Sequence, residues 1–118
     1  MSRNSIRNCL EDYQRARLCF VRTMFSFSEK PYTLQLLQEF DFLDLLLPLL
    51  ADRVHSIQHT ALVTLGRLAA AKPLLQEILD KGVLASVLHK FNQQSKLYKK
   101  TALHVLTDLM NKDERLLH

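Results

Sequence analysis

Two histidines come nearest to a pattern that could do chemistry. His55 and His59 stand four residues apart, a spacing that on a helix lets two imidazoles bind one metal ion. A zinc-peptidase motif would also need a glutamate directly after the first histidine, and Ser56 occupies that position. No nearby cysteine or carboxylate offers an obvious third ligand. We therefore expect no metal, no cofactor and no catalytic residue, and interpret the pair as polar residues that face a groove or solvent.

The two cysteines do not indicate chemistry either. If Cys9 and Cys19 share one helix, they lie roughly 15 Å apart along its axis. A disulfide needs Cα atoms within about 7 Å, so the two thiols cannot pair. We interpret both as packing residues in a protein from a reducing compartment. Gly66 and Gly82 are isolated from each other, so we expect no phosphate-binding loop.

A short basic cluster is a candidate for contact with an acidic protein surface. It consists of Lys96, Lys99 and Lys100 together with Tyr98. Charges of this kind steer association more than they set affinity. The simpler interpretation, which we favour, is a solvated helix start with Tyr98 half buried. Three lysines and one aromatic ring, in a chain of net charge +4, fall short of a nucleic-acid footprint.

Composition bounds the fold class that must position these residues. The chain has 118 residues, enough for one domain, and 47% of them are hydrophobic, so it can bury a core. Two glycines and three prolines are few for a fold rich in tight turns, which favours an all-α chain. The most apolar stretch, residues 40–51, is shorter than the ~20 residues of a membrane span and contains two aspartates. We expect a cytoplasmic protein with neither a signal peptide nor a membrane segment.

Apolar spacing predicts a long first helix and a short, interrupted second segment. One stripe recurs every seven residues and predicts a helix of about six turns with a break at residues 26–30. The stripe consists of Ile6, Tyr13, Phe20 and Phe27, with Leu10 and Met24 on its flank. Pro31 suits the start of a brief helix to residue 40. Asp41 is a good N-cap for the next helix, which Pro48 must kink or end.

The second half of the sequence predicts four helices. The clearest spans residues 54–71, where apolar side chains return every three or four positions. Pro73 suits the start of another helix and Gly82 its end. A short helix over residues 83–91 and a long one over residues 95–111 complete the series.

An internal repeat is the decisive feature. We compared the sequence with a copy of itself, shifted so that Thr60 aligns with Thr101, and we call this shift the repeat offset. At this offset small apolar residues align with small ones and large with large. The same offset aligns Ala61 with Ala102, Leu62 with Leu103, Leu65 with Leu106 and Leu68 with Leu109. In the opposite direction it aligns Ala61, Leu65 and Leu68 with the apolar residues Phe20, Met24 and Phe27. A period of about 40 residues with three helices per unit is typical of armadillo repeats, whose units stack because none can bury its apolar face alone. The alternative is an irregular helical bundle with coincidental spacing.

The repeat predicts a fold and a domain plan. We expect an all-α, armadillo-type superhelical solenoid of about two and a half repeats with an open C-terminal end. In this plan residues 1–40 form N-terminal capping helices, residues 41–82 form one repeat, and residues 83–118 form the second repeat and the start of the next. The whole chain is then a single domain.

In such a stack the long helix of each repeat lines a concave groove, which predicts protein-binding residues. One row consists of His59, Val63 and Arg67, and the next of Lys100, His104 and Asp108. Armadillo proteins that import nuclear cargo carry tryptophan and asparagine at the last two positions of each row. Both rows lack this pair, so we do not expect nuclear-import cargo binding.

Three runs of residues resemble a known family. Residues 56–69 read Ser-Ile-Gln-His-Thr-Ala-Leu-Val-Thr-Leu-Gly-Arg-Leu-Ala. This run is similar to the first full repeat of the sperm-associated antigen six family, the armadillo proteins of the axonemal central pair. Residues 97–102 and residues 13–21 also resemble family motifs, Phe-Tyr-Lys-Lys-Ala and Tyr-Gln-Lys-Ala-Arg followed by Phe-Val. The resemblance covers nearly the whole chain, as an N-terminal portion of the family.

The resemblance implies a non-enzymatic, protein-binding scaffold of the central apparatus of cilia and flagella, required for motility. Implied partners are other central-pair proteins, with tubulin's acidic tails as the natural candidate for the basic cluster. We expect neither nucleic acid nor membrane as a partner. The implied location is the cytoskeleton of the axoneme.

Three departures from the family pattern leave an alternative open. Asp41 stands where the family usually has glycine, Pro48 interrupts a helix, and the sequence stops at His118 where family members continue. The alternative is a truncated paralogue or isoform that competes for partners or self-associates through its open end. Self-association of this kind would bury the leucines Leu109, Leu116 and Leu117.

Overall fold

The computed structural model describes residues 2–30, 37, 39–70, 72–83, 85, 87 and 96–112. Every regular element within these ranges is helical, which confirms the all-α prediction. The elements are α1 (Arg3–Ser28), α3 (Phe42–Leu46), the 3-10 helix η2 (Leu47–Ala51), α4 (His55–Leu68), α5 (Lys72–Asp80) and α7 (Lys96–Lys112). Most of the predicted helix from Pro31 to residue 40 and most of the one over residues 83–91 lie outside the described residues.

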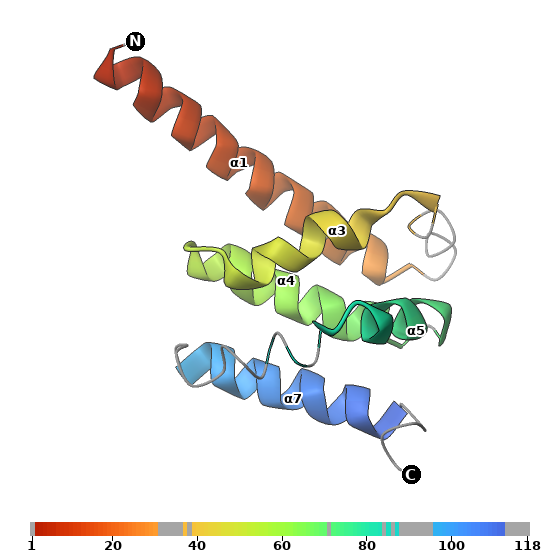
Figure 1. Ribbon diagram of the computed structural model, residues 1–118. Coiled ribbons are helices and arrows are strands. Elements are labelled where there is room, and N and C mark those ends of the chain that lie inside the picture. The colour runs from red at the N-terminus through yellow and green to blue at the C-terminus, as the bar shows by residue number, and fades with distance from the viewer. Residues whose placement is uncertain are drawn as a thin grey trace.

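The long helices form three successive layers. α4 lies between α1 and α7 and packs against both, and η2 packs on α4 (Figure 1). The N-terminal half of α1 projects away from the other helices. None of the described helices is both long enough and apolar enough to cross a bilayer.

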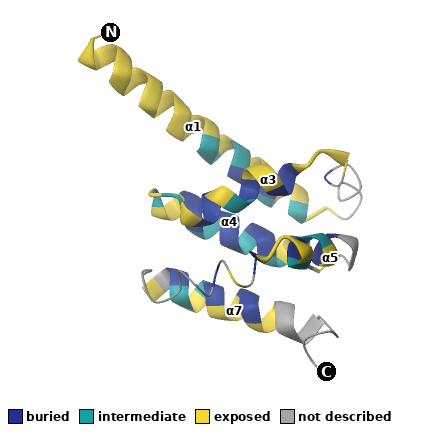
Figure 2. Ribbon diagram, in the orientation of Figure 1, coloured by how far each residue is buried: buried dark blue, intermediate teal, exposed yellow. Residues whose placement is uncertain are grey.

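The core centres on α4, the helix that the sequence marked most clearly. Buried residues recur along the whole of α4, whereas the first half of α1 is exposed throughout (Figure 2). Five apolar side chains of α4 are completely buried: Ile57, Ala61, Leu62, Leu65 and Leu68. This burial follows from the position of α4, which has a neighbouring helix on both flanks.

The residues that were predicted to begin or end helices mostly stand at helix ends in the structure. Gly82 ends the turn after α5 with a φ of 71°, a conformation that a Cβ atom disfavours. Pro48 stops α3 at Leu46, and the chain continues as the 3-10 helix η2, because proline has no N–H for an α-helical hydrogen bond. Asp41 stands at the N-cap of α3, but its side chain makes no capping hydrogen bond, so that part of the prediction is wrong.

The predicted stripe of α1 is only partly covered. α1 buries Val21 and Met24 near its C-terminal end, while Ile6, Leu10 and Tyr13 are 48%, 63% and 63% exposed. The cause is a difference in length, since α1 has 26 residues and α4 has 14. The described elements therefore leave the first half of α1 exposed.

Positions one repeat offset apart have matching environments except at the last layer. Ala61 and Ala102 are both fully buried, and Leu65 and Leu106 are both buried. Leu62 of α4 is fully buried, but its equivalent Leu103 of α7 is 60% exposed. Within the described residues α7 has no helix on its outer flank, which explains this difference.

Candidate functional site

The predicted row on α4 touches both neighbouring helices. The His59 ring Nδ1 lies 3.3 Å from the Thr101 hydroxyl of α7. At the other end of the row, Arg67 donates a hydrogen bond of 2.6 Å to Glu29, just after α1, and its guanidinium lies 4.2 Å from the centre of the Phe25 ring. Val63 lies between them, half buried. A guanidinium has five N–H donors, and the hydrogen bond to Glu29 uses one of them. Arg67 can therefore donate further hydrogen bonds.

The predicted row on α7 is open to solvent. Lys100, His104 and Asp108 are all exposed along one side of the helix. In the neighbouring basic cluster, Lys96 is exposed and Lys99 is half buried. These side chains offer a partner both signs of charge.

Tyr98 lies inside the fold and not on the surface of the basic cluster. Its side chain is 3% exposed, and burial raises the pKa of its phenol. The reason is its register, because Tyr98 stands one repeat offset after Ile57, which is fully buried. The sequence analysis expected half burial, and the structure buries the ring almost completely.

The metal and cysteine candidates show no assembled site. Among the described residues, no three His, Cys, Asp or Glu side chains gather closely enough to hold a metal ion. Cys9 and Cys19 are unpaired, as predicted, but both are exposed. Their interpretation as packing residues is therefore wrong, because α4 does not cover those faces of α1.

A buried ion pair that the sequence analysis missed joins α1 to the start of α4. Arg17 donates two hydrogen bonds, of 2.6 and 3.3 Å, to the carboxylate of Asp52, and the two side chains are only 19% and 5% exposed. Asp52 also accepts the Val54 N–H at 2.9 Å. Burial alone would raise the pKa of Asp52, but the hydrogen bonds from Arg17 and Val54 and the charge of Arg17 lower it overall. The hydrogen bond to Asp52 likewise raises the pKa of Arg17.

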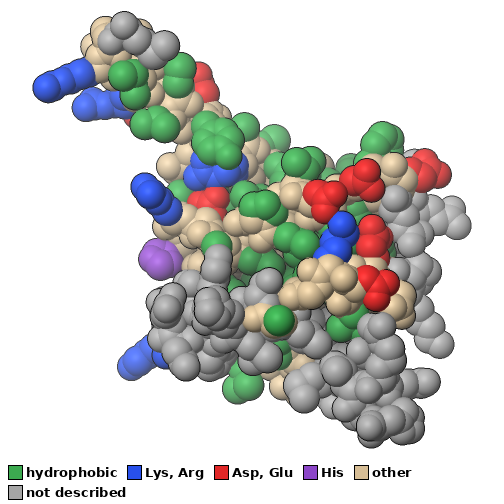
Figure 3. Space-filling view, viewed as in Figure 1, with side chains coloured by type: hydrophobic (Ala, Val, Ile, Leu, Met, Phe, Trp, Pro, Cys, Tyr) green, Lys and Arg blue, Asp and Glu red, His purple; other side chains and the backbone are tan. Residues whose placement is uncertain are grey.

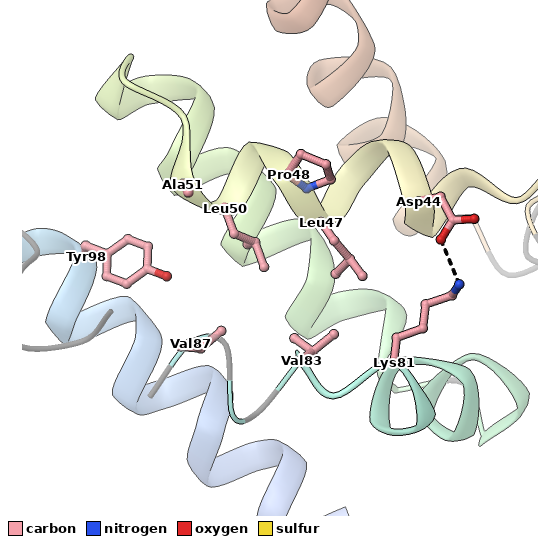
Figure 4. A pocket seen from close by; sticks show the side chains of 9 residues that line it. All are labelled: Asp44, Leu47, Pro48, Leu50, Ala51, Lys81, Val83, Val87 and Tyr98. Carbon is pink, nitrogen blue, oxygen red and sulfur yellow. Dashed lines mark hydrogen bonds and ion pairs between the residues drawn. The ribbon is translucent and has the colours of Figure 1, made fainter. Parts of the chain in front are cut away.

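A second feature absent from the sequence analysis is an apolar cleft of about 520 Å³ between successive layers (Figure 4). The 3-10 helix η2 supplies one wall, and residues after α5 supply the other. Apolar side chains line most of it: Leu47, Pro48, Leu50, Ala51, Val83 and Val87. Tyr98 lies at one end, and an ion pair of 2.7 Å between Lys81 and Asp44 lies at the other.

The repeat explains why space remains in this cleft. Its two valines, Val83 and Val87, stand one repeat offset after Phe42 and Leu46, so the second layer carries smaller side chains at equivalent positions. Smaller side chains at equivalent positions fill less volume. The valines are therefore one reason why space remains beside η2.

The rim of the cleft near Lys81 is acidic. The hydrogen bond from Lys81 to Asp44, together with the charges of Glu77 and Asp41, raises the pKa of Lys81. Figure 3 shows acidic side chains gathered around basic ones on this side of the molecule, beside exposed hydrophobic atoms. Three carboxylates and one ammonium leave this part of the rim net negative.

Comparison with known proteins adds a family relationship. No family model matches the chain. Over 103 residues the chain is 37% identical to sperm-associated antigen 6 of Mus musculus, and the match covers 86% of this chain and 20% of the mouse protein. Sperm-associated antigen 6 of Homo sapiens is 36% identical over 103 residues, with the same coverage. The chain thus spans about a fifth of the length of these relatives.

Proposed function

Because the chain belongs to the family of sperm-associated antigen 6, we propose that it is a non-enzymatic, protein-binding scaffold of the axoneme of cilia and flagella. Its fold in this proposal is an armadillo-type solenoid in which residues 41–82 form one repeat. The observation that supports the proposal is the stacking of α1, α4 and α7 as successive layers whose core positions recur at the repeat offset.

The proposed binding surface runs across the long helices. It consists of His59, Val63 and Arg67 on α4 and of Lys100, His104 and Asp108 on α7, with Lys96 and Lys99 beside them. Tyr98 contributes from beneath, where its buried ring fixes the start of α7. The exposed lysines suit an acidic partner, for which the tails of tubulin and the proteins of the central pair are candidates.

Localisation and co-sedimentation test this function. We expect the tagged full chain to concentrate in the axoneme of ciliated cells, and the purified chain to pellet with microtubules. The triple variant Lys96→Glu, Lys99→Glu and Lys100→Glu should lose most of the pelleting, and so should wild type with microtubules that lack their acidic tails. The triple variant Arg3→Glu, Arg7→Glu and Arg15→Glu, on the exposed part of α1, changes the net charge by the same amount and is the matched control. A chain that stays wholly diffuse in ciliated cells contradicts the proposal.

A second candidate function is self-association, or competition for the partners of its relatives, through the exposed side of α7. The exposure of Leu103 favours it, because the equivalent Leu62 is fully buried by the next layer. The side chains of Leu109, Leu116 and Leu117, which this function would also bury, lie outside the described residues. The variant Leu103→Gln should abolish self-association of this kind in sedimentation velocity, and an unchanged profile would contradict it.

A further inference from the structure

The projecting half of α1 carries an apolar stripe that the described chain leaves mostly exposed. Ile6, Leu10 and Tyr13 follow each other at intervals of four and three residues and are each about half exposed or more. That spacing places them on one side of the helix, in the pattern that helices use to enter grooves. We call this stripe the α1 tip.

The α1 tip also has a basic flank. Arg3 and Arg7 stand one turn apart beside Ile6 and Leu10, and neither makes an ion pair within the described part of the chain. Arg15, further along, is already paired with Asp12. The first two turns therefore present apolar side chains next to unpaired cationic ones.

The cleft beside η2 has the opposite character. It is a hollow of about 520 Å³ with an apolar lining, within the range of about 300–1,000 Å³ common for binding pockets. Asp44 and Lys81 form an ion pair at its rim, and the charges of Asp41 and Glu77 also act on Lys81, so this side of the cleft is net negative and attracts cations. The same chain thus has an apolar projection with a basic flank and an apolar recess with an acidic rim.

We propose that the α1 tip of one chain docks into the cleft beside η2 of a second copy, with Ile6 and Leu10 in the apolar recess and Arg3 and Arg7 at its acidic rim. The contact is heterologous, because the two copies use different surfaces. Repeated contacts therefore extend into open chains or close into a ring. The interface is small, so the association depends on protein concentration.

Charge favours this occupant over a parallel pairing of two α1 tips. Parallel tips would bring Arg3 and Arg7 of one copy beside the same arginines of the other, and like charges in contact oppose association. The net negative charge around Lys81 instead attracts both arginines. The proposal goes beyond the axonemal function and is tested on the purified chain, so that either can fail without the other.

Sedimentation of the full chain with two single variants tests the contact. Leu10→Gln removes the apolar anchor of the tip, and Ala51→Trp places an indole over the cleft from an exposed position of η2. We expect wild type to associate as its concentration rises. Each variant alone should associate at least about tenfold more weakly than wild type. An equal mixture of the two variants should recover dimers but nothing larger, because one intact tip and one intact cleft remain.

Two further measurements separate this contact from other occupants. Arg7→Glu should weaken association, and mixing it with an Asp44→Lys chain should restore it. Phe40→Gln, which replaces an exposed aromatic side chain outside both proposed surfaces, is the matched control and should associate as wild type does. Circular dichroism checks that each variant keeps its helical content. Wild type that stays monomeric throughout, or Ala51→Trp that associates normally, overturns the proposal, and the second result would indicate pairing of the tips themselves.

Discussion

Asp52 connects α1 to the start of α4 through its carboxylate. It accepts two hydrogen bonds from Arg17 of α1 and one from the backbone N–H of Val54, which precedes α4. An almost completely buried carboxylate is stable only when its charge and its lone pairs are satisfied. Arg17 also lies over the Tyr13 ring, with its guanidinium 4.5 Å from the ring centre. The pair thereby fixes where α1 crosses the start of α4.

We expect Arg17→Ala to lower the free energy of unfolding by about 2–3 kcal/mol, because it leaves the buried Asp52 carboxylate without its cation. Urea unfolding followed by circular dichroism measures this change. Arg15→Ala is the matched control, since its partner Asp12 is also an aspartate but both side chains are mostly exposed, and it should change stability by about 0.5 kcal/mol or less. Equal losses for the two variants would contradict a special role for Arg17.

The lowered pKa of Asp52 gives the same pair a pH dependence. A carboxylate whose native pKa lies below its unfolded value of about 3.9 stabilises the fold above that value. This contribution is lost as the pH falls through the native pKa. We expect the stability difference between wild type and Asp52→Asn to be largest near neutral pH and to shrink below about pH 4. A difference that stays constant as the pH falls well below that value would show that the carboxylate charge is not what matters.

At the scale of elements, the contact between α4 and α7 depends on one glycine. A Cβ atom at Gly66 would lie 3.0 Å from Cγ2 of Val105, closer than side chains normally approach. Gly66 therefore lets α7 approach α4 closely, although glycine has a lower helix propensity than other residues except proline.

We expect Gly66→Ile to lower the free energy of unfolding by about 1–3 kcal/mol, because the larger side chain pushes α7 away from α4. Val105→Ala opens space opposite it, so the double variant should lose less than the sum of the two single losses. Thermal or urea denaturation of the three variants measures this coupling. Strictly additive losses would mean that the two residues do not meet.

Sequence predicted the helices well and their mutual contacts less well. α4 and α7 were predicted within a few residues, because their apolar positions repeat at helical spacing and recur between the two helices at the repeat offset. The stripe of α1 was predicted to be one face, but spacing alone does not reveal that α4 is too short to cover it. The basic cluster was predicted from composition, and only the register of Tyr98 with Ile57 could have shown that its ring is buried.

The ion pair and the cleft could not be predicted from local sequence. Arg17 and Asp52 are separated by 35 residues and belong to different repeat positions, so no periodic signal joins them. The cleft depends on a difference in side-chain volume between two layers, Val83 and Val87 against Phe42 and Leu46. That difference was visible in the sequence, but its effect requires knowing that the layers face each other.

At the scale of the whole molecule, the fold consists of a stacked core and a projecting N-terminal half of α1 whose side chains are exposed. We expect deletion of residues 2–12 to change the free energy of unfolding by less than about 1 kcal/mol, because these side chains are exposed and make no contact with the core. Urea denaturation at low protein concentration measures this, so that association does not contribute. A loss of several kcal/mol would indicate that the projecting half of α1 folds back onto the body in solution.

The central place of α4 sets an order in which the molecule can open. α1 and α7 can each detach by breaking one set of contacts between layers, whereas α4 becomes accessible to water only when a neighbour has left. Amide protons of α4 should therefore exchange with deuterium last of all, after those of both outer helices. On heating, the two outer helices therefore unfold first. The segment from His55 to Leu68 keeps its native structure longest.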